Sequence, residues 1–100
     1  MFVAEENAWI IGFIAFGLVS ETGSLMQPVT YGRIGSVGVA AGHRGKGVGR
    51  ALVALAEEWA ARRGAADMRL QVWSFNERAM AVYEELGYSV RSHVLGMRLP

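Results

Sequence analysis

A glycine-rich, basic segment in the middle of the chain carries residue types that can bind an anion. It runs from Gly42 to Arg50 with the sequence GHRGKGVGR. Alternating glycines let a backbone approach a ligand closely, at Gly45, Gly47 and Gly49. Cations lie between and beside these glycines, at Arg44, Lys46 and Arg50. A helix predicted from Val48 would add free N–H groups with partial positive charge, so the segment predicts an anion site, most commonly for phosphate.

The segment differs from two common nucleotide-binding motifs. A Walker A loop continues with Lys and Ser or Thr, but Val48 and Gly49 follow Gly47 here. A dinucleotide-binding fingerprint requires a third glycine where this sequence has Arg50. The pattern that remains is R-x-x-G-x-G, formed by Arg44, Gly47 and Gly49.

Strands are predicted before this segment. Residues rich in Val, Ile and Phe predict strands over 2–5, 9–19 and 31–41. A turn over 6–8 joins the first two strands as a hairpin, and Ser, Thr, Gly and Pro predict a loop over 20–28.

Two helices and three further strands are predicted after it. Apolar spacing predicts a helix from Val48 through Arg62 and Arg63, with an outer Glu58–Arg62 pair and Gly64 just beyond its end. A strand over 68–73 precedes a second helix, which is capped by Ser74 or Asn76 and ends at Gly87. Closing strands are predicted over 88–91 and 94–99. Trp59 and Trp73 are expected to be core or interface aromatics. The order is β-β-β-α-β-α-β-β, an α+β or mixed α/β domain over residues 1–100.

Two stretches together resemble the GNAT superfamily of acetyl-CoA-dependent N-acetyltransferases. The stretch from Val37 to Leu52 closely resembles motif A of that family. A second block, in which Asn, Ala, Tyr and a closing Leu-Gly-aromatic recur in order, is matched by Asn76, Ala79, Tyr83 and Leu86-Gly87-Tyr88. The two blocks cover about residues 34–88. The resemblance implies a GNAT-like, mostly antiparallel central sheet with two flanking helices.

The resemblance also implies site residues for acetyl-CoA as cosubstrate. The backbone of Val37, Gly38 and Val39 would hydrogen-bond the pantetheine arm, as an added strand does. The pyrophosphate would be held by the basic segment, through Arg44, Gly45, Lys46, Gly47, Val48, Gly49 and Arg50. Asn76 would contact the cofactor, although its position also suits a helix cap. Tyr83 would be the general acid toward the departing thiolate, although periodicity alone would place it in the core.

The general base that deprotonates the amine is not assigned. Where amino-terminal acetyltransferases of the family often have Glu, this chain has Gln71, and residues 33–41 contain no carboxylate. Ser36, His43 and His93 remain as candidates to position a water or to titrate. The oxyanion would be stabilised by a backbone N–H near Val39.

The sequence therefore predicts an acetyltransferase acting by direct attack of a primary amine, and the amine acceptor is expected to be a small molecule or a peptide. A CoA-binding regulatory or degenerate domain without turnover is the alternative, and a nucleotide-binding domain of another type is a third. The net charge of +1 excludes a strong electrostatic drive toward nucleic acid or an anionic membrane. The absence of cysteine and of a HExxH motif argues against a metal site, and no apolar run is long enough to span a bilayer. A cytoplasmic protein is expected.

The usual first strand and two helices of the family are not found in this sequence. We expect a naturally short protein, a fragment, or a wall supplied by another chain. The sheet edge and apolar surface that this would expose favour a homodimer.

Overall fold

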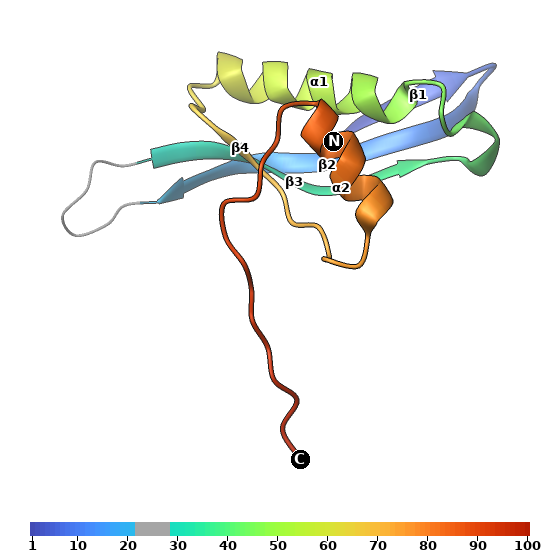
Figure 1. Ribbon diagram of the computed structural model, residues 1–100. Coiled ribbons are helices and arrows are strands. Elements are labelled where there is room, and N and C mark those ends of the chain that lie inside the picture. The colour runs from blue at the N-terminus through green and yellow to red at the C-terminus, as the bar shows by residue number, and fades with distance from the viewer. Residues whose placement is uncertain (22–28) are drawn as a thin grey trace.

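The structure, a computed structural model, describes residues 1–21 and 29–100 (Figure 1). One sheet has the strand order β1-β2-β3-β4. Its strands are β1 (Phe2–Glu6), β2 (Trp9–Glu21), β3 (Val29–Val39) and β4 (Met68–Arg69). All neighbours are antiparallel except β3 and β4, which are parallel. Two helices, α1 (Val48–Arg62) and α2 (Glu77–Glu85), and a short 3₁₀ turn, η1 (Ala41–His43), complete the described elements. The predicted mixed α/β fold with a mostly antiparallel sheet is confirmed.

The first two strands form the predicted hairpin. The turn between them places Asn7 and Ala8 at positive φ, 51° and 68°. β2 continues two residues beyond its predicted end, to Glu21, and β3 spans 29–39 where 31–41 was predicted. The predicted loop over 20–28 therefore begins later than expected, and its residues 22–28 lie outside the described part of the chain.

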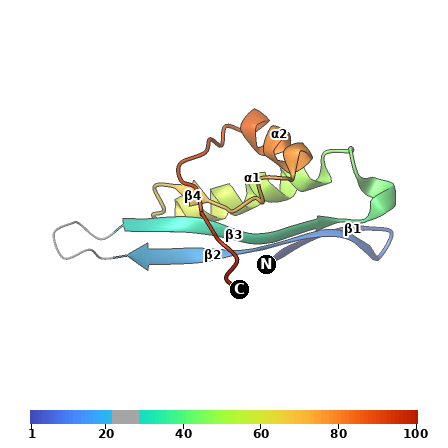
Figure 2. The same cartoon turned by 60° about the horizontal axis from the view of Figure 1, so that its bottom comes forward.

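The core lies between α1 and one face of the sheet. Leu52, Val53 and Ala56 of α1 are buried against Ile14 of β2 and Ile34 of β3. Fully burying a side chain such as Leu or Ile contributes about 1.5–3 kcal/mol. α2 lies on the same side of the sheet as α1, and no described helix covers the opposite face (Figure 2). The two flanking helices are thus both on one face.

The ends of α1 agree with the sequence prediction. The predicted Glu58–Arg62 pair forms on its exposed side. Gly64 follows the C-cap residue Arg63 with φ of +87°, the left-handed conformation expected of a glycine that terminates a helix. Gly32 of β3 faces α1, where an added Cβ would lie 2.9 Å from the Ala60 Cβ and 2.3 Å from the Met68 sulfur. The absence of a side chain there lets the helix approach the sheet.

The predicted strands in the last third of the chain are largely wrong. β4 pairs with β3 only at Gly32 and Arg33, so the predicted strand over 68–73 is reduced to two residues. The closing strands over 88–91 and 94–99 do not form, and residues 88–100 leave the sheet as an extended segment (Figure 1). Apolar alternation gives strand propensity, but a strand forms only against a partner edge, and β4 is too short to provide one.

Asp67 connects this last segment to the sheet. Its Oδ2 accepts hydrogen bonds from Arg91 Nη1 at 2.5 Å and from Arg69 Nε at 3.0 Å. These two guanidinium groups lower the pKa of the Asp67 carboxyl below its usual value, and Arg91 has the larger effect. The Asp67 side chain is 21% exposed, so solvent screens the interaction only partly.

Replacing Asp67 with Asn should produce a pH-dependent loss of stability. Because the folded-state pKa is lowered, the stabilisation is present above the unfolded-state pKa and is lost as the pH falls through the folded-state pKa. Asp67→Asn should lower the free energy of unfolding by about 1 kcal/mol near neutral pH. The difference should shrink as the pH falls below the usual carboxyl pKa of 3.8 and close below the lowered folded-state pKa. Urea unfolding of the wild type and the variant, at neutral pH and at an acidic pH well below 3.8, measures this difference in the free energy of unfolding. Glu58→Gln, which breaks an exposed pair, is the control and should cost only a few tenths of a kcal/mol. An equal loss for Asp67→Asn at both pH values would contradict the account.

Candidate functional site

The glycine-rich turn lies between β3 and α1, as predicted, and its backbone is open to a ligand. Gly45 and Gly47 have φ of +77° and +83°, and a Cβ at either residue would meet nothing within 4 Å. Gly47 is the N-cap residue of α1 and supplies no side-chain cap. The N–H groups of the first helical turn are therefore left for another acceptor, which is the arrangement that binds anions.

The cations of this turn are held in different ways. Arg44 Nε donates to the Val39 carbonyl oxygen at 3.2 Å, which ties the turn to the end of β3. Arg50 forms an ion pair with Glu85 of α2. Lys46 is exposed. The turn thus keeps positive charge at the start of α1, while the charge of Arg50 is shared with a carboxylate.

A cleft opens where β3 separates from the segment that follows β4. Past Arg33 no strand of the described chain pairs with this edge of β3. The backbone groups that the edge presents from Ile34 to Gly38 therefore have no strand partner. The resulting cavity has a volume of about 220 Å³. It is lined from β3 by Ile34, Gly35, Ser36 and Val37, from the following segment by Leu70, Gln71, Val72 and Trp73, and from the α2 region by Asn76, Ala79 and Tyr83.

The cavity brings together residues from both parts of the predicted site. Val37 from the first block lies in the same lining as Asn76 and Tyr83 from the second. Gly38 and Val39 continue β3 from the cavity toward the glycine-rich turn. Val37, Asn76 and Tyr83 therefore lie around one cavity, and β3 leads from that cavity to the turn before α1.

Tyr83 is held at this cavity by aromatic packing and partial burial. Its ring meets that of Tyr88 edge-on, with centroids 5.7 Å apart and an interplanar angle of 78°. The Tyr88 hydroxyl donates to Glu57 Oε2 of α1 at 2.7 Å, which fixes the Tyr88 ring. No described side chain hydrogen-bonds the Tyr83 hydroxyl. Burial raises the pKa of Tyr83 above its usual value, so its phenol keeps a proton that it can donate.

Asn76 is the N-cap of α2. Its Oδ1 accepts a hydrogen bond from the Ala79 N–H at 3.2 Å, whereas Ser74, the other predicted cap, lies before the helix without this role. The cap uses the amide oxygen, which leaves the amide NH₂ available to a ligand in the cavity.

Removing the Asn76 cap should destabilise the protein measurably. Asn76→Ala leaves an N–H of the first turn of α2 without its partner, which costs about 1 kcal/mol. In a domain of this size the melting temperature should fall by about 4–8 °C, as measured by circular dichroism. Asn76→Asp keeps an acceptor oxygen and should melt close to the wild type. An unchanged melting temperature for Asn76→Ala would contradict the capping role.

Of the three candidate bases, only Ser36 lies at the cavity. Ser36 lines the cavity, and so does Gln71. His43 lies outside this lining, with Nε2 2.8 Å from Glu6 Oε2. His93 lies in the extended segment after α2. Among the described residues that line the cavity, none is a carboxylate or a histidine.

Trp73 is a lining residue for which the sequence left a core position and an interface position open. It is 76% exposed at the cavity, and so is not a core residue. Trp59 of α1, by contrast, packs edge-on against Phe16 with centroids 4.9 Å apart, as a core-flanking aromatic should. Strand alternation in 68–73 could have placed Trp73 on the same side as Gln71, toward the cleft.

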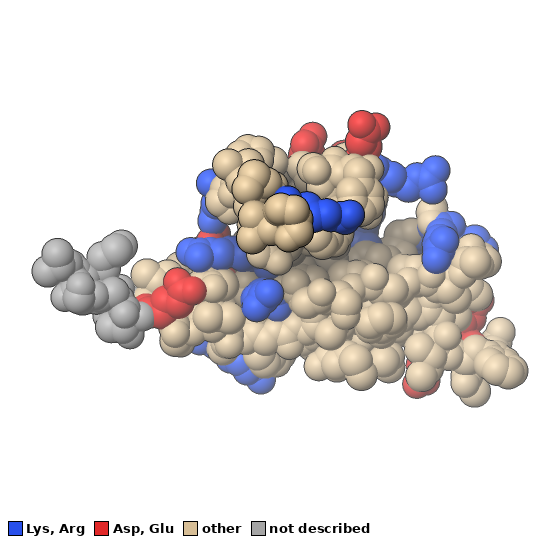
Figure 3. Space-filling view, turned by 90° about the horizontal axis from the view of Figure 1, so that it is seen from below, with Lys and Arg blue, Asp and Glu red and all other residues tan. Residues whose placement is uncertain are grey.

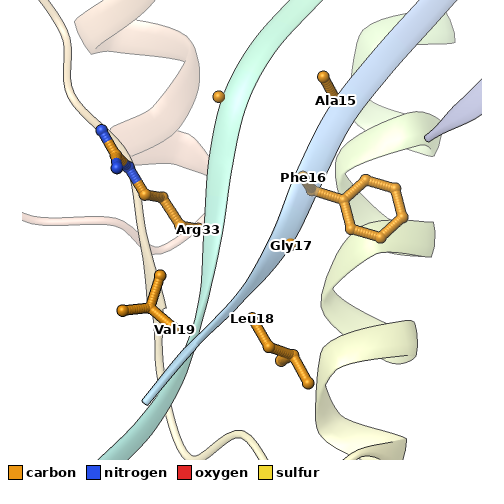
Figure 4. A pocket seen from close by; sticks show the side chains of 7 residues that line it. Ala15, Phe16, Gly17, Leu18, Val19 and Arg33 are labelled. Carbon is orange, nitrogen blue, oxygen red and sulfur yellow. The ribbon is translucent and has the colours of Figure 1, made fainter. Parts of the chain in front are cut away.

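A second hollow, of about 250 Å³, lies over β2 and β3 and contains none of the predicted site residues. Its lining is mainly apolar, and its Phe16 is directed toward α1 (Figure 4). Over the described ranges, no helix is long and apolar enough to cross a membrane. The same ranges hold no group of three or more acidic or histidine side chains that could bind a metal ion.

Comparison with known proteins gives consistent matches. Residues 1–88 match the model of the acetyltransferase (GNAT) family. The chain is 41% identical over 56 residues to streptothricin acetyltransferase of Streptomyces lavendulae, a match that covers 56% of this chain and 30% of that protein. This chain is therefore much shorter than the curated relative.

Solved structures share the fold. A mutant of the BH1408 protein from Bacillus halodurans matches with a TM-score of 0.88 and 26% identity, over 99% of this chain and 63% of that one. An aminoglycoside N-acetyltransferase solved in complex with CoA matches with a TM-score of 0.84 and 19% identity, over 98% of this chain and 73% of that one.

Proposed function

Because the chain belongs to the GNAT family of acetyltransferases, we propose that it transfers an acetyl group from acetyl-CoA to a primary amine. The observation that carries this proposal is the cavity between β3 and residues 70–73. It joins Val37, Asn76 and Tyr83, and the free edge of β3 leads from it to the glycine-rich turn.

Acetyl-CoA would follow that path. The pantetheine arm would lie along Val37, Gly38 and Val39, whose backbone has no strand partner on the cleft side. The pyrophosphate would rest on the first turn of α1, over residues 45–50. Two observations support this placement: the uncapped N–H groups after Gly47, and the open space over Gly45 and Gly47.

The chain's own groups would then assist direct transfer. As the amine nitrogen bonds to the acetyl carbon, a backbone N–H near Val39 would stabilise the oxyanion. As the carbon–sulfur bond breaks, the Tyr83 hydroxyl would donate its proton to the departing thiolate. The proton lost by the amine would pass to water, which Ser36 is placed to orient.

A CoA-binding domain without turnover remains the second candidate. It is favoured by one observation, the lack of a carboxylate or histidine among the described lining residues. An assay for free CoA thiol separates the two. The enzyme should release thiol from acetyl-CoA only when an amine is present. Saturable binding of acetyl-CoA without amine-dependent thiol release would support the binding domain and overturn the enzyme.

Relatives support a small-molecule acceptor. Streptothricin and aminoglycosides appear in the names of the similar proteins, and by similarity we propose a small amine for this chain. We also propose a homodimer, because apolar side chains of the helix-free sheet face are exposed, including Val3 and Phe13. The cytoplasm is the location that we propose for it.

A further inference from the structure

Two exposed aromatic side chains stand beside the cavity. Trp73 lines it, and the Trp73 ring stacks on that of Phe75 with centroids 6.0 Å apart and an interplanar angle of 17°. The two side chains are 76% and 79% exposed. Large aromatic rings exposed at the wall of a cavity are characteristic of binding surfaces.

The cavity offers this aromatic pair neutral surroundings. Its described polar side chains are all uncharged: Ser36, Gln71, Asn76 and Tyr83. Uncharged residues also make up most of the surface on the side of the molecule shown in Figure 3. A polycationic acceptor would have to lose hydration from several charges there without meeting a carboxylate.

We infer that Trp73, backed by Phe75, is the specificity-determining contact for the acceptor, and that the acceptor is a small monoamine carried on an aromatic or apolar body. This inference rests on the proposed function. The body of the acceptor would stack on the indole ring, and its ammonium group would be attracted to the ring face before it loses a proton.

The neutral lining would also help the acceptor amine to lose its proton, although no general base is assigned. Removal of an ammonium group from water favours its uncharged form, so a single amine that enters this cavity loses its proton more readily. An acceptor with several ammonium groups binds less favourably there, because the groups that stay charged must also lose hydration without meeting a carboxylate. The same feature that disfavours polycations thus helps a monoamine to become nucleophilic.

Steady-state kinetics with three amines test the inference. We expect the wild type to use 2-phenylethylamine with kcat/KM about 10-fold or more above that for spermidine or kanamycin. Trp73→Ala should raise the KM for 2-phenylethylamine by about 10-fold and leave the KM for acetyl-CoA unchanged, whereas Trp73→Phe should keep most of the affinity. Trp9→Ala is the matched control, because Trp9 lies at the start of β2 and is also 76% exposed. It should change neither constant.

The outcomes separate the inference from the proposed function. A preference for spermidine or kanamycin, or a less than twofold change in the 2-phenylethylamine KM for Trp73→Ala, would overturn the inference and leave acetyl transfer standing. Binding of acetyl-CoA without acetylation of any of the three amines would also overturn it. Failure of the folded wild type to bind acetyl-CoA would overturn the proposed function itself.

Discussion

Gly47→Asp should weaken the binding of acetyl-CoA by about 100-fold or more, so that a titration no longer reaches saturation. The substitution places a carboxylate at the N-cap of α1, where a phosphate would otherwise meet the free N–H groups. A Cβ added at Gly47 would meet no atom within 4 Å, so the carboxylate has room to turn toward the anion site. An acidic residue at a helix N-terminus favours the helix, so the fold should survive. Isothermal titration calorimetry with acetyl-CoA measures the loss, and circular dichroism verifies the helix content.

Two controls separate charge from other effects. Gly96→Asp makes the same chemical change in the extended segment after α2, also in open space, and should leave binding unchanged. Gly47→Ala introduces the strain of a side chain at φ of +83° without a charge, and should weaken binding less than Gly47→Asp. Binding by Gly47→Asp with wild-type affinity would show that the glycine-rich turn is not the phosphate site.

Tyr83→Phe should lower kcat by about 100-fold or more while the Kd for acetyl-CoA stays the same. The variant keeps the ring that packs against Tyr88 and removes only the proton donor. Because burial raises the pKa of Tyr83 above its usual value of 10.0, the wild-type phenol is protonated throughout the neutral range. The deficit should therefore be constant across that range. Thiol release in the presence of a saturating amine measures it.

Tyr88→Phe is the matched control for this result. It removes the same atom from the neighbouring ring, whose hydroxyl faces Glu57 of α1. We expect a small loss of stability and a kcat within a few-fold of the wild type. Equal kcat values for Tyr83→Phe and Tyr88→Phe would rule out Tyr83 as the general acid.

Most of the correct sequence predictions rest on residues that are close together in the sequence. The glycine that follows α1 (Gly64), the Asn76 cap and the Glu58–Arg62 pair depend on residues within one or two helical turns of one another. Such features are determined by backbone sterics and neighbouring side chains, so the sequence contains what is needed to predict them.

The predictions that failed depend on distant partners. The apolar alternation in 94–99 suits a strand, but the structure gives that segment no edge to pair with. The strand over 68–73 is shortened because its residues diverge from β3, and this divergence creates the cavity. Trp73 was expected to be a core or interface aromatic; its exposure excludes the core, and its position beside the cleft accompanies that divergence. The cleft itself, the central feature of the site, could not be derived from spacing alone.

Titration of the purified wild-type chain with acetyl-CoA tests the central claim most directly. The account predicts saturable heat with one site per chain, because the cavity, the free β3 edge and the start of α1 together form one path for the ligand. A folded sample that gives no saturable heat would contradict it, since the family fold would then be present without a working acetyl-CoA site.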